Sequence, residues 1–301
     1  MNLKTNFAEK FGSSFNENVK LSNLSWFNLG GNAEYFFKAK NKNQLIEFLK
    51  EAKKIKTNIT ILGAGSNTLI RDNGVKGFVL KLGKEFSYIK KINKDTLEVG
   101  SATLDRQVAN FAKDNSLKNF EFLSCIPGSI GGAIIMNSGC YGNDISKVLV
   151  SLTAIDKNNC SEIEIKKDDI KFLYRGSNLS NDLIITSATF KGLLGRKEEI
   201  ERSQAQLVEK KKNSQPSQIK TCGSTFKNIS SDKKAWMLIK EAGCDNLSEG
   251  DATISQKHCN FFVNNGNAKS SDIENLIKKV KKKVYEKTGI NLELEIKIIG
   301  E

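Results

Sequence analysis

Two glycine-rich segments, far apart in the sequence, constrain the fold of this chain more than any other feature. The first, Gly63-Ala-Gly-Ser-Asn67, directly follows the apolar run at 59–62, and the second is Ile126-Pro-Gly-Ser-Ile-Gly-Gly-Ala133. Glycine at this density destabilises the interior of a helix or a strand, because it loses much backbone freedom and gains no side-chain packing. We therefore predict that both segments are loops in which the fold requires a bare backbone.

The first glycine-rich segment matches neither of the common phosphate-binding fingerprints. Thr68 stands at the third glycine position of the G-x-G-x-x-G pattern, and no amphipathic helix follows it. A P-loop is excluded because no lysine followed by serine or threonine is present there. Taken alone, this segment fits a plain turn between strands equally well. Taken together, the two segments could converge on one extended phosphate-bearing cofactor, with a pair of structural turns as the alternative.

Histidine and cysteine usage excludes several classes of site. His258 is the only histidine, so two-histidine metal sites are excluded and a Ser–His–Asp triad would have to use His258. None of the six cysteines is two or three residues from another, so no zinc-finger or thioredoxin-like spacing exists. We expect no metal site, and we expect free thiols in a reducing compartment.

Hydrophobic periodicity predicts a chain of mixed α and β structure. Helical spacing predicts helices over residues 43–55, 104–115 and 271–287, and a charged connecting helix over 195–212. Apolar and β-branched runs predict strands over 59–62, 77–82, 95–99, 148–155, 161–165 and 183–190. Residues 292–299 alternate in polarity, which predicts a final strand with Glu293, Glu295 and Lys297 on its polar face.

The chain is strongly basic. It has 47 Lys and Arg against 34 Asp and Glu, a net charge of +13, which favours acidic ligands such as phosphates. The lysine cluster at 278–283 suggests nucleic-acid binding, but Val280 and Val284 preserve an apolar stripe, so we interpret it as the solvated face of a helix and expect no nucleic-acid partner. No apolar run approaches the roughly 18 residues of a membrane span, and residues 1–20 lack a secretion signal. We expect a cytoplasmic protein without membrane insertion.

Seven motifs in order carry a resemblance to a known family. They are Asn28-Leu-Gly-Gly31, Gly63-Ala-Gly-Ser-Asn67, Ile126-Pro-Gly-Ser-Ile-Gly-Gly-Ala133, Met136-Asn-Ser-Gly-Cys-Tyr-Gly142, Tyr174-Arg-Gly-Ser177, Gly223-Ser-Thr-Phe-Lys-Asn228 and Leu294-Glu-Ile-Lys-Ile-Ile-Gly300. Together they resemble the UDP-N-acetylenolpyruvoylglucosamine reductase (MurB) family of peptidoglycan synthesis. The resemblance covers about residues 28–300 and fits the shorter branch of the family, since no insertion lies between Leu183 and Gly223.

The resemblance implies an α+β protein with an FAD-binding fold of the PCMH type. Two α/β subdomains would bind FAD, the first over 1–82 with 294–301 and the second over 83–200, and a smaller α+β domain over 201–293 would bind a UDP sugar. NADPH would be the co-substrate. We expect non-covalent FAD, because His258 lies outside the cofactor subdomains, although a link to Cys125 or Cys140 stays open. The oligomeric state is left open, with a monomer favoured.

The resemblance also implies a reaction and its residues. NADPH reduces the flavin, the flavin passes hydride to carbon 3 of the enolpyruvyl ether, and carbon 2 is protonated to give UDP-N-acetylmuramate. Ser224 matches the proton donor, and Arg175 and Glu295 match residues that stabilise the enol. Substrate contacts would include Arg175, Lys227, Asn228 and His258. The expected cofactor-binding residues are Gly63, Ala64, Gly65, Ser66, Asn67, Pro127, Gly128, Ser129, Gly131, Gly132 and Asn137.

Simpler interpretations exist for each of these residues. Ser224 beside a glycine could be a turn serine, Arg175 a surface ion-pair residue, Glu295 an outward-facing carboxylate and His258 a structural residue. Cys125 also departs from the family, which usually has glycine before Ile-Pro-Gly, and its Cβ could crowd the flavin. Two other functions remain as alternatives: a PCMH-type flavin oxidase acting on an alcohol or lactone, and, more remotely, a basic nucleic-acid-binding protein.

Overall fold

The computed structural model describes residues 3–301. Met1 and Asn2 belong to the segment 1–20, in which we predict no secretion signal, and they lie outside the described residues. The chain forms two compact units that are interleaved along the sequence. Unit 1 contains residues 3–16, 36–64 and 78–211, and unit 2 contains 17–35, 65–77 and 212–301. The chain passes between the units in the loop after Ala64 and within β1 (Phe15–Lys20), β2 (Asn32–Ala39), β5 (Val75–Leu82) and α5 (Lys197–Ser214). The division at 1–82, 83–200 and 201–293 stays a prediction.

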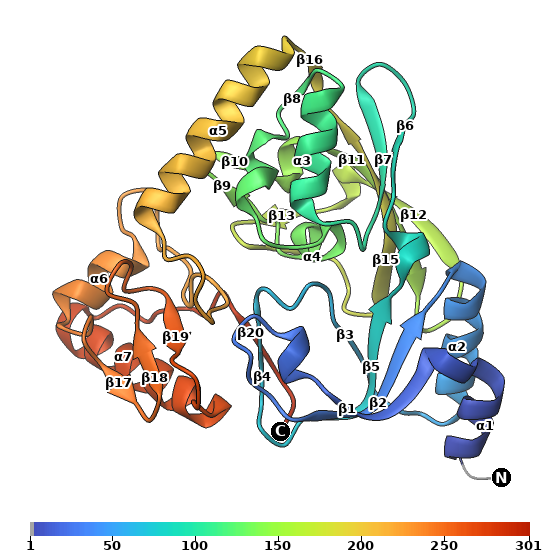
Figure 1. Ribbon diagram of the computed structural model, residues 1–301, viewed down its shortest axis with the longest axis horizontal. Helices are drawn as coiled ribbons and strands as arrows, with labels where there is room; N and C mark the ends of the chain where they lie inside the picture. Colours follow the sequence, from blue (N-terminus) through green and yellow to red (C-terminus); the bar gives the residue numbers. More distant parts are fainter. Residues whose placement is uncertain (1–2) are drawn as a thin grey trace. The chain divides into compact units, whose positions relative to one another are not determined.

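An aromatic cluster organises the N-terminal part of unit 1. Helices α1 (Leu3–Phe11) and α2 (Lys42–Lys54) lie beside the sheet β1-β2-β5-β3, in which β3 (Ile59–Ile61) runs parallel to β5 (Figure 1). The rings of Phe37 and Phe48 stack at 3.9 Å, and Phe78 meets Phe48 edge-on. Buried aromatic rings contribute large apolar areas, so this cluster joins the helices to the sheet. The helix predicted over 43–55 and the strands over 59–62 and 77–82 are confirmed.

The rest of unit 1 is built on a five-stranded antiparallel sheet of order β12-β11-β15-β7-β6. Its strands are β6 (Ile89–Lys91), β7 (Thr96–Gly100), β11 (Leu149–Asp156), β12 (Glu162–Lys166) and β15 (Leu183–Lys191). Helix α3 (Asp105–Asp114) buries its apolar face in the same core, with Val108, Ala109 and Ala112. These elements confirm the helix and the four strands predicted between residues 95 and 190.

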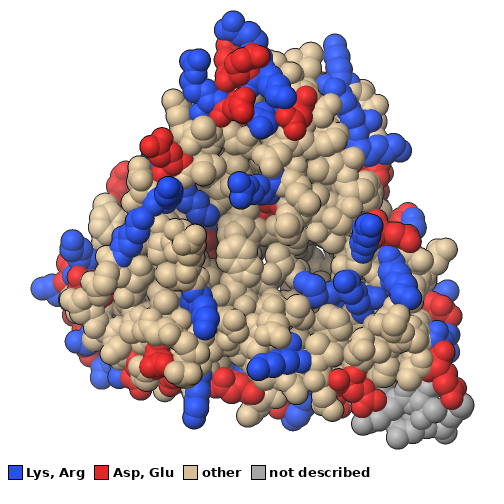
Figure 2. All heavy atoms as spheres, viewed as in Figure 1, with Lys and Arg blue, Asp and Glu red and all other residues tan. Residues whose placement is uncertain are grey.

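Helix α5 confirms the charged connecting helix. Only Ile200 and Gln204 are buried along it. Around its first turns, at the top of Figure 2, Lys and Arg side chains lie among Asp and Glu side chains. Lys118 and Arg196 both contact the carboxylate of Glu199, the first at 2.8 Å. The positive charge is therefore partly balanced locally here.

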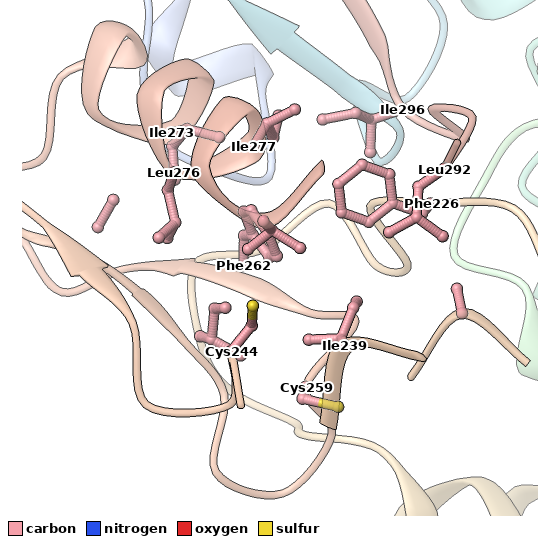
Figure 3. Close-up of a cluster of buried hydrophobic side chains, with 14 of the residues drawn as sticks. Phe226, Ile239, Cys244, Cys259, Phe262, Ile273, Leu276, Ile277, Leu292 and Ile296 are labelled. Atoms are coloured by element: carbon pink, nitrogen blue, oxygen red, sulfur yellow. The ribbon is translucent and has the colours of Figure 1, made fainter. Parts of the chain in front are cut away.

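Unit 2 packs α6 (Ala235–Glu241) and α7 (Ser270–Thr288) against the sheet β17-β18-β19, whose strands are Ser248–Glu249, Ala252–Ile254 and Phe262–Asn264. Figure 3 shows the core, in which Ile273, Leu276 and Ile277 of α7 face Phe262 and Phe226. The helix predicted over 271–287 is confirmed, and the lysines of residues 278–283 lie on its outer side, as Val280 and Val284 are buried. Among residues 3–301, no helix has both the length and the apolar character that crossing a bilayer requires.

Two predictions of local structure are wrong. The second glycine-rich segment is only partly a loop, because α4 (Ile130–Ile135) includes Gly131 and Gly132. A Cβ at Gly131 would lie 3.2 Å from the Cβ of Ser101, so close packing explains a glycine inside this helix. The final strand is also shorter than predicted: β20 (Lys297–Ile299) pairs with β4 (Thr68–Ile70) in parallel, whereas the preceding residues form only an isolated bridge between Phe226 and Leu294.

Candidate active site

The two glycine-rich segments meet within unit 1. Gly63 follows β3 directly, and a Cβ at Gly63 would lie 3.1 Å from the hydroxyl oxygen of Ser129. Ser129 is buried, and its backbone bridges to Leu104 just before α3. The structure therefore brings Gly63 of the first segment next to Ser129 of the second.

A lysine that sequence reasoning missed lies at the same place. The amino group of Lys81, on β5, donates a hydrogen bond to the carbonyl oxygen of Gly63. Burial lowers the pKa of Lys81, and the neighbouring Lys38 lowers it further, while no carboxylate counteracts them. A desolvated cation without a carboxylate partner favours an anionic ligand beside it. The signal for Lys81 exists only in three dimensions, because nothing in its sequence neighbourhood distinguishes it.

The backbone of the second segment lies directly on the start of α3. The N–H of Asp105 donates to the carbonyl of Gly128 at 3.1 Å, and the N–H of Gly131 donates to the carbonyl of Ser101 at 2.8 Å. A Cβ at Gly128 would lie 2.6 Å from Oδ2 of Asp105. Glycine is required at this position because any side chain would displace a buried carboxyl group.

Asp105 is a second residue that sequence reasoning missed. It is fully buried, and neither of its carboxyl oxygens has a hydrogen-bond partner among the described residues. Burial raises the pKa of Asp105 well above its usual value, which favours the neutral acid. An uncharged carboxyl group next to Gly128 does not repel an anion bound by the loop.

Asn137 and Arg175 are both held by the same part of unit 1. The side chain of Asn137 donates to the carbonyl of Leu173 at 3.1 Å and accepts from the N–H of Ser146 at 3.0 Å. Its amide thus holds the hairpin of β13 (Phe172–Leu173) and β14 (Gly176–Ser177), whose loop carries Arg175. Arg175 has a positive φ of 56° and donates to the carbonyl of Gly139 at 2.5 Å. Its guanidinium lies 4.9 Å from the ring centre of Tyr174. A strained backbone and these contacts fix the direction of the arginine.

Ser224 lies in unit 2, on a segment that donates hydrogen bonds to both the backbone carbonyl and the side chain of Asn260. Thr225 donates its N–H to the Asn260 carbonyl at 2.8 Å, and Phe226 donates to Oδ1 of Asn260 at 3.0 Å. Gly223 precedes Ser224 with a φ of +81°. Ser224 is half-buried, and within its own unit its hydroxyl makes no hydrogen bond to a described residue. The backbone around Ser224 is therefore held by hydrogen bonds to Asn260.

Glu295 and the second half of the first glycine-rich segment join Ser224 in unit 2. Glu295 donates its N–H to the carbonyl of Thr225 at 2.8 Å, and its own carbonyl accepts from the Asn67 side chain at 3.0 Å. Glu295 is half-buried, whereas Glu293 and Lys297 are exposed. Asn67, Ser224 and Glu295 therefore come from three adjacent backbone segments, although their positions in the sequence are far apart.

The backbone around position 65 explains why a glycine stands there. Its φ is +70°, and a Cβ there would lie 1.8 Å from the carbonyl oxygen of Leu24. Its carbonyl accepts from the N–H of Trp26 at 3.0 Å. Ala64 and Ser66, on either side, are half-buried. The contact with Leu24 explains the glycine at 65 without any ligand.

The predicted substrate contacts differ in their surroundings. Lys227 lies 3.5 Å from the carboxylate of Glu293, and Oδ1 of Asn228 accepts from the N–H of Ala235 at the start of α6. His258 accepts at Nδ1 from the N–H of Asn260 at 3.3 Å, and its ring packs 4.8 Å from that of Phe261. Burial lowers the pKa of His258, which favours the neutral ring with its proton on Nε2. These contacts give His258 a structural role in holding Asn260 and, through it, the Ser224 segment.

Comparison with known proteins covers nearly the whole chain. Residues 33–161 match a family model described as an FAD binding domain, and residues 215–299 match the UDP-N-acetylenolpyruvoylglucosamine reductase, C-terminal domain. The chain is 48% identical over 295 residues to the UDP-N-acetylenolpyruvoylglucosamine reductase of Pelagibacter ubique (strain HTCC1062), covering 97% of each chain. It is 41% identical to the enzyme of the same name from Orientia tsutsugamushi (strain Ikeda), covering 97% of this chain and 96% of that one.

A solved structure agrees with these relatives. The crystal structure of UDP-N-acetylenolpyruvylglucosamine reductase (MurB) from Thermus caldophilus superimposes with a TM-score of 0.81 at 30% identity, covering 94% of this chain and 98% of that one. The predicted α+β, FAD-binding fold is thereby confirmed. The chain belongs to the UDP-N-acetylenolpyruvoylglucosamine reductase family, whose members are flavin oxidoreductases.

Proposed function

We propose that this protein reduces UDP-N-acetylenolpyruvoylglucosamine to UDP-N-acetylmuramate in peptidoglycan synthesis, with non-covalent FAD as cofactor and NADPH as electron source. The observation that carries the proposal is the similarity to reductases of this name, which extends over 97% of the chain and includes both matched domains. We further propose a cytoplasmic monomer without a nucleic-acid or membrane partner.

The residues of unit 1 fit FAD. The backbone of Gly63 lies beside Ser129 with no side chain between them, Lys81 supplies a positive charge that no carboxylate balances, and burial of Asp105 beneath Gly128 favours its neutral form. Backbone N–H groups and one cation are the groups that hold a diphosphate in proteins. When bound, FAD supplies the two-electron transfer from NADPH to carbon 3 of the enolpyruvyl ether.

Ser224 is the group to which we assign protonation of carbon 2. A serine hydroxyl is a weak acid, but proton transfer to a carbon that carries negative charge is favourable enough to use it. The Asn260 contacts fix the backbone around Ser224, so the hydroxyl need not be ordered again at each turnover.

Arg175 and Glu295 are assigned to stabilisation of the enol. A guanidinium that is already oriented by Gly139 and Tyr174 pairs with a carboxylate or enolate with little loss of side-chain entropy. Glu295 would contribute as a hydrogen-bond donor if it keeps its proton in the presence of substrate. Lys227 and Asn228 are assigned to the diphosphate of the UDP sugar and His258 to the shape of the substrate-binding segment.

Absorption spectroscopy tests the proposed function directly. The purified protein should be yellow, acid precipitation should release the flavin into the supernatant, and anaerobic NADPH should bleach the flavin bands. Addition of UDP-N-acetylenolpyruvoylglucosamine should then restore them at a rate that depends on its concentration. Fast reoxidation by air with no response to this substrate would instead indicate an oxidase, and a colourless protein would contradict both functions.

A further inference from the structure

Lys38 and Lys81 lie on the face of the sheet β1-β2-β5-β3 that the aromatic cluster does not occupy. Phe37 of β2 and Phe78 of β5 both pack against the ring that α2 contributes to this cluster. Successive side chains of a strand point to opposite faces of the sheet. Lys38, one residue after Phe37, and Lys81, three residues after Phe78, therefore point to the face opposite the cluster.

The two lysines lie side by side at the ends of neighbouring strands. β2 and β5 are adjacent in the sheet, and the N–H of Gly83, just after β5, donates to the carbonyl of Ala39, the last residue of β2, at 2.8 Å. Lys38 is exposed and Lys81 is half-buried. This end of the sheet therefore carries a local positive charge.

Lys81 also contacts the place where the two glycine-rich segments meet. Ile61 of β3 pairs with Leu80 of β5, so Gly63 follows β3 alongside Lys81. The amino group of Lys81 donates to the carbonyl oxygen of Gly63, and a Cβ at Gly63 would lie 3.1 Å from the hydroxyl oxygen of Ser129. The lysine, the bare backbone of the first segment and the serine of the second are therefore neighbours within unit 1.

The contact with Gly63 uses only part of the hydrogen-bonding capacity of Lys81. An ammonium group has three N–H donors and no acceptor. Within residues 3–301, the Gly63 carbonyl is the protein acceptor that the Lys81 amino group reaches, and no carboxylate acts on that amino group. A cation with two further donors binds an anionic oxygen ligand more strongly than a neutral one.

FAD fits this place better than the other phosphate-bearing ligands of the proposed reaction. Lys38, Gly63, Lys81 and Ser129 all lie within residues 33–161, which match the FAD binding domain. The residues assigned to the diphosphate of the UDP sugar lie in unit 2 instead. NADPH has to leave in every turnover, whereas FAD stays bound, so a lysine fixed to the glycine-rich backbone suits the resident cofactor.

We propose that Lys81 is the cation that binds the diphosphate of FAD, with one N–H on the Gly63 carbonyl and the other two donated to phosphate oxygens. Lys38 adds to the attraction through its charge. The inference rests on the proposed function, in which FAD is the resident cofactor. It adds that one side-chain charge, and not the glycine backbone alone, determines how tightly the protein holds FAD.

Ultrafiltration of the full-length protein measures the Kd for FAD in each variant. Lys81→Gln keeps a neutral donor and removes the charge, and it should raise the Kd by about 10- to 100-fold, the usual contribution of a hydrogen bond to a charged group. Lys81→Arg keeps the charge and should restore most of the affinity. Lys38→Gln, at an exposed position that tolerates substitution, should raise the Kd by about two- to threefold through the lost charge. Lys76→Gln removes the same charge from the other end of β5 and is the matched control, with no expected change.

Salt dependence separates an effect of charge from a purely structural role of Lys81. In the parent protein the Kd for FAD should rise between about 0.05 and 0.5 M sodium chloride, because salt screens the attraction between the lysines and the diphosphate. The rise should be smaller in Lys81→Gln and unchanged in Lys76→Gln. Phosphorus NMR of bound FAD should show shifted diphosphate resonances in Lys81→Gln but not in Lys76→Gln.

The outcomes that contradict the inference are distinct from those that contradict the proposed function. An unchanged Kd in Lys81→Gln or in Lys38→Gln, an equal loss in Lys76→Gln, or a parent-like salt dependence in Lys81→Gln would each overturn it. An unchanged Kd for FAD with slower second-order reduction by NADPH would overturn it in favour of NADPH as the ligand of Lys81. A parent protein that holds FAD but does not pass electrons to UDP-N-acetylenolpyruvoylglucosamine would contradict the proposed function and leave the role of Lys81 in place.

Discussion

At the scale of single residues, the side chains assigned to chemistry are held by neighbours that make no chemical contribution themselves. Asn260 fixes the segment around Ser224, Asn137 fixes the hairpin of Arg175, and Asp105 lies under Gly128. All three supporting residues are buried. Asn137 was predicted from its motif, but as a cofactor-binding residue and not as a support of the Arg175 hairpin. Asn260 and Asp105 were not predicted, because their contacts come from remote parts of the sequence.

Replacement of the proposed acid gives the most direct prediction at this scale. Ser224→Ala should leave anaerobic reduction of the flavin by NADPH nearly unchanged and slow its reoxidation by UDP-N-acetylenolpyruvoylglucosamine by about 10²–10⁴-fold, the usual contribution of a general acid. Stopped-flow absorption resolves the two half-reactions. Ser230→Ala, an exposed serine of the same unit, is the control. If reoxidation stays fast in Ser224→Ala, the serine is not the proton donor.

Asp105 predicts a pH dependence of stability. Its pKa in the folded protein is raised, so the folded state holds a proton that the unfolded state has lost above about pH 4. The stability that this proton provides is complete below that pH and is lost as the pH rises toward the folded pKa. Over that range the parent protein should lose about 1.4 kcal/mol per pH unit relative to Asp105→Asn.

Urea unfolding at several pH values measures this difference. The amide introduced by Asp105→Asn would remain uncharged throughout, so only the slope of the difference against pH is informative, whatever the substitution costs at a single pH. Asp114→Asn, on the exposed end of the same helix, should show no such slope between about pH 5 and 7, since the pKa of Asp114 is lowered. Parallel pH profiles for parent and Asp105→Asn would mean that Asp105 is charged when buried.

For helices and strands, sequence-based prediction succeeds where local contacts form the element and fails where contacts with distant residues form it. Helices α2, α3, α5 and α7 carry their own periodicity and were all predicted. Helix α1 was missed because its buried Phe7 and Phe11 pack on aromatic rings from β2, α2 and β5, which its polar neighbours do not indicate. The final strand was predicted too long because alternating polarity shows only that one face of the segment is buried. An extended segment with one isolated bridge buries a face in the same way as a strand with a full ladder of hydrogen bonds.

A comparison of Gly65 with Gly289 tests whether the contact with Leu24 is the reason for the glycine at position 65. Gly65 and Gly289 have the same φ of +70°, but a Cβ at Gly65 would lie 1.8 Å from Leu24, whereas nothing lies within 4 Å of one at Gly289. Gly289→Ala should therefore cost only the left-handed backbone penalty, about 1 kcal/mol. Gly65→Ala should cost at least about 3 kcal/mol, because the Leu24 backbone must also move. Urea unfolding measures both values, and equal costs would exclude the contact with Leu24 as the cause.

At the scale of the whole molecule, the net charge and the interleaved units are the features that a list of motifs cannot convey. Residues 65–77 belong to unit 2 because Arg71 and Asp72 bind Glu274 and Ser270 of α7, with Arg71 donating at 2.7 and 3.0 Å. One glycine-rich segment thus contributes Gly63 to unit 1 and Asn67 to unit 2. The sequence analysis placed residues 65–77 in the first predicted subdomain, 1–82 with 294–301, and that division stays a prediction. The side-chain contacts of Arg71 and Asp72 join residues 65–77 to unit 2.

The net charge of +13 predicts that the rate of flavin reduction by NADPH depends on salt concentration. NADPH carries several negative charges, and a positively charged protein attracts it over distances comparable with the Debye length, about 10 Å at 0.1 M salt. The second-order rate constant for flavin reduction at low NADPH concentration should therefore fall by about tenfold or more between about 0.02 and 0.5 M sodium chloride. The first-order rate at saturating NADPH is the internal control and should change little, because hydride transfer within the complex involves no approach of charges. A second-order constant that is insensitive to salt would show that the excess lysines act elsewhere, as the solvated outer face of α7 already suggests for residues 278–283.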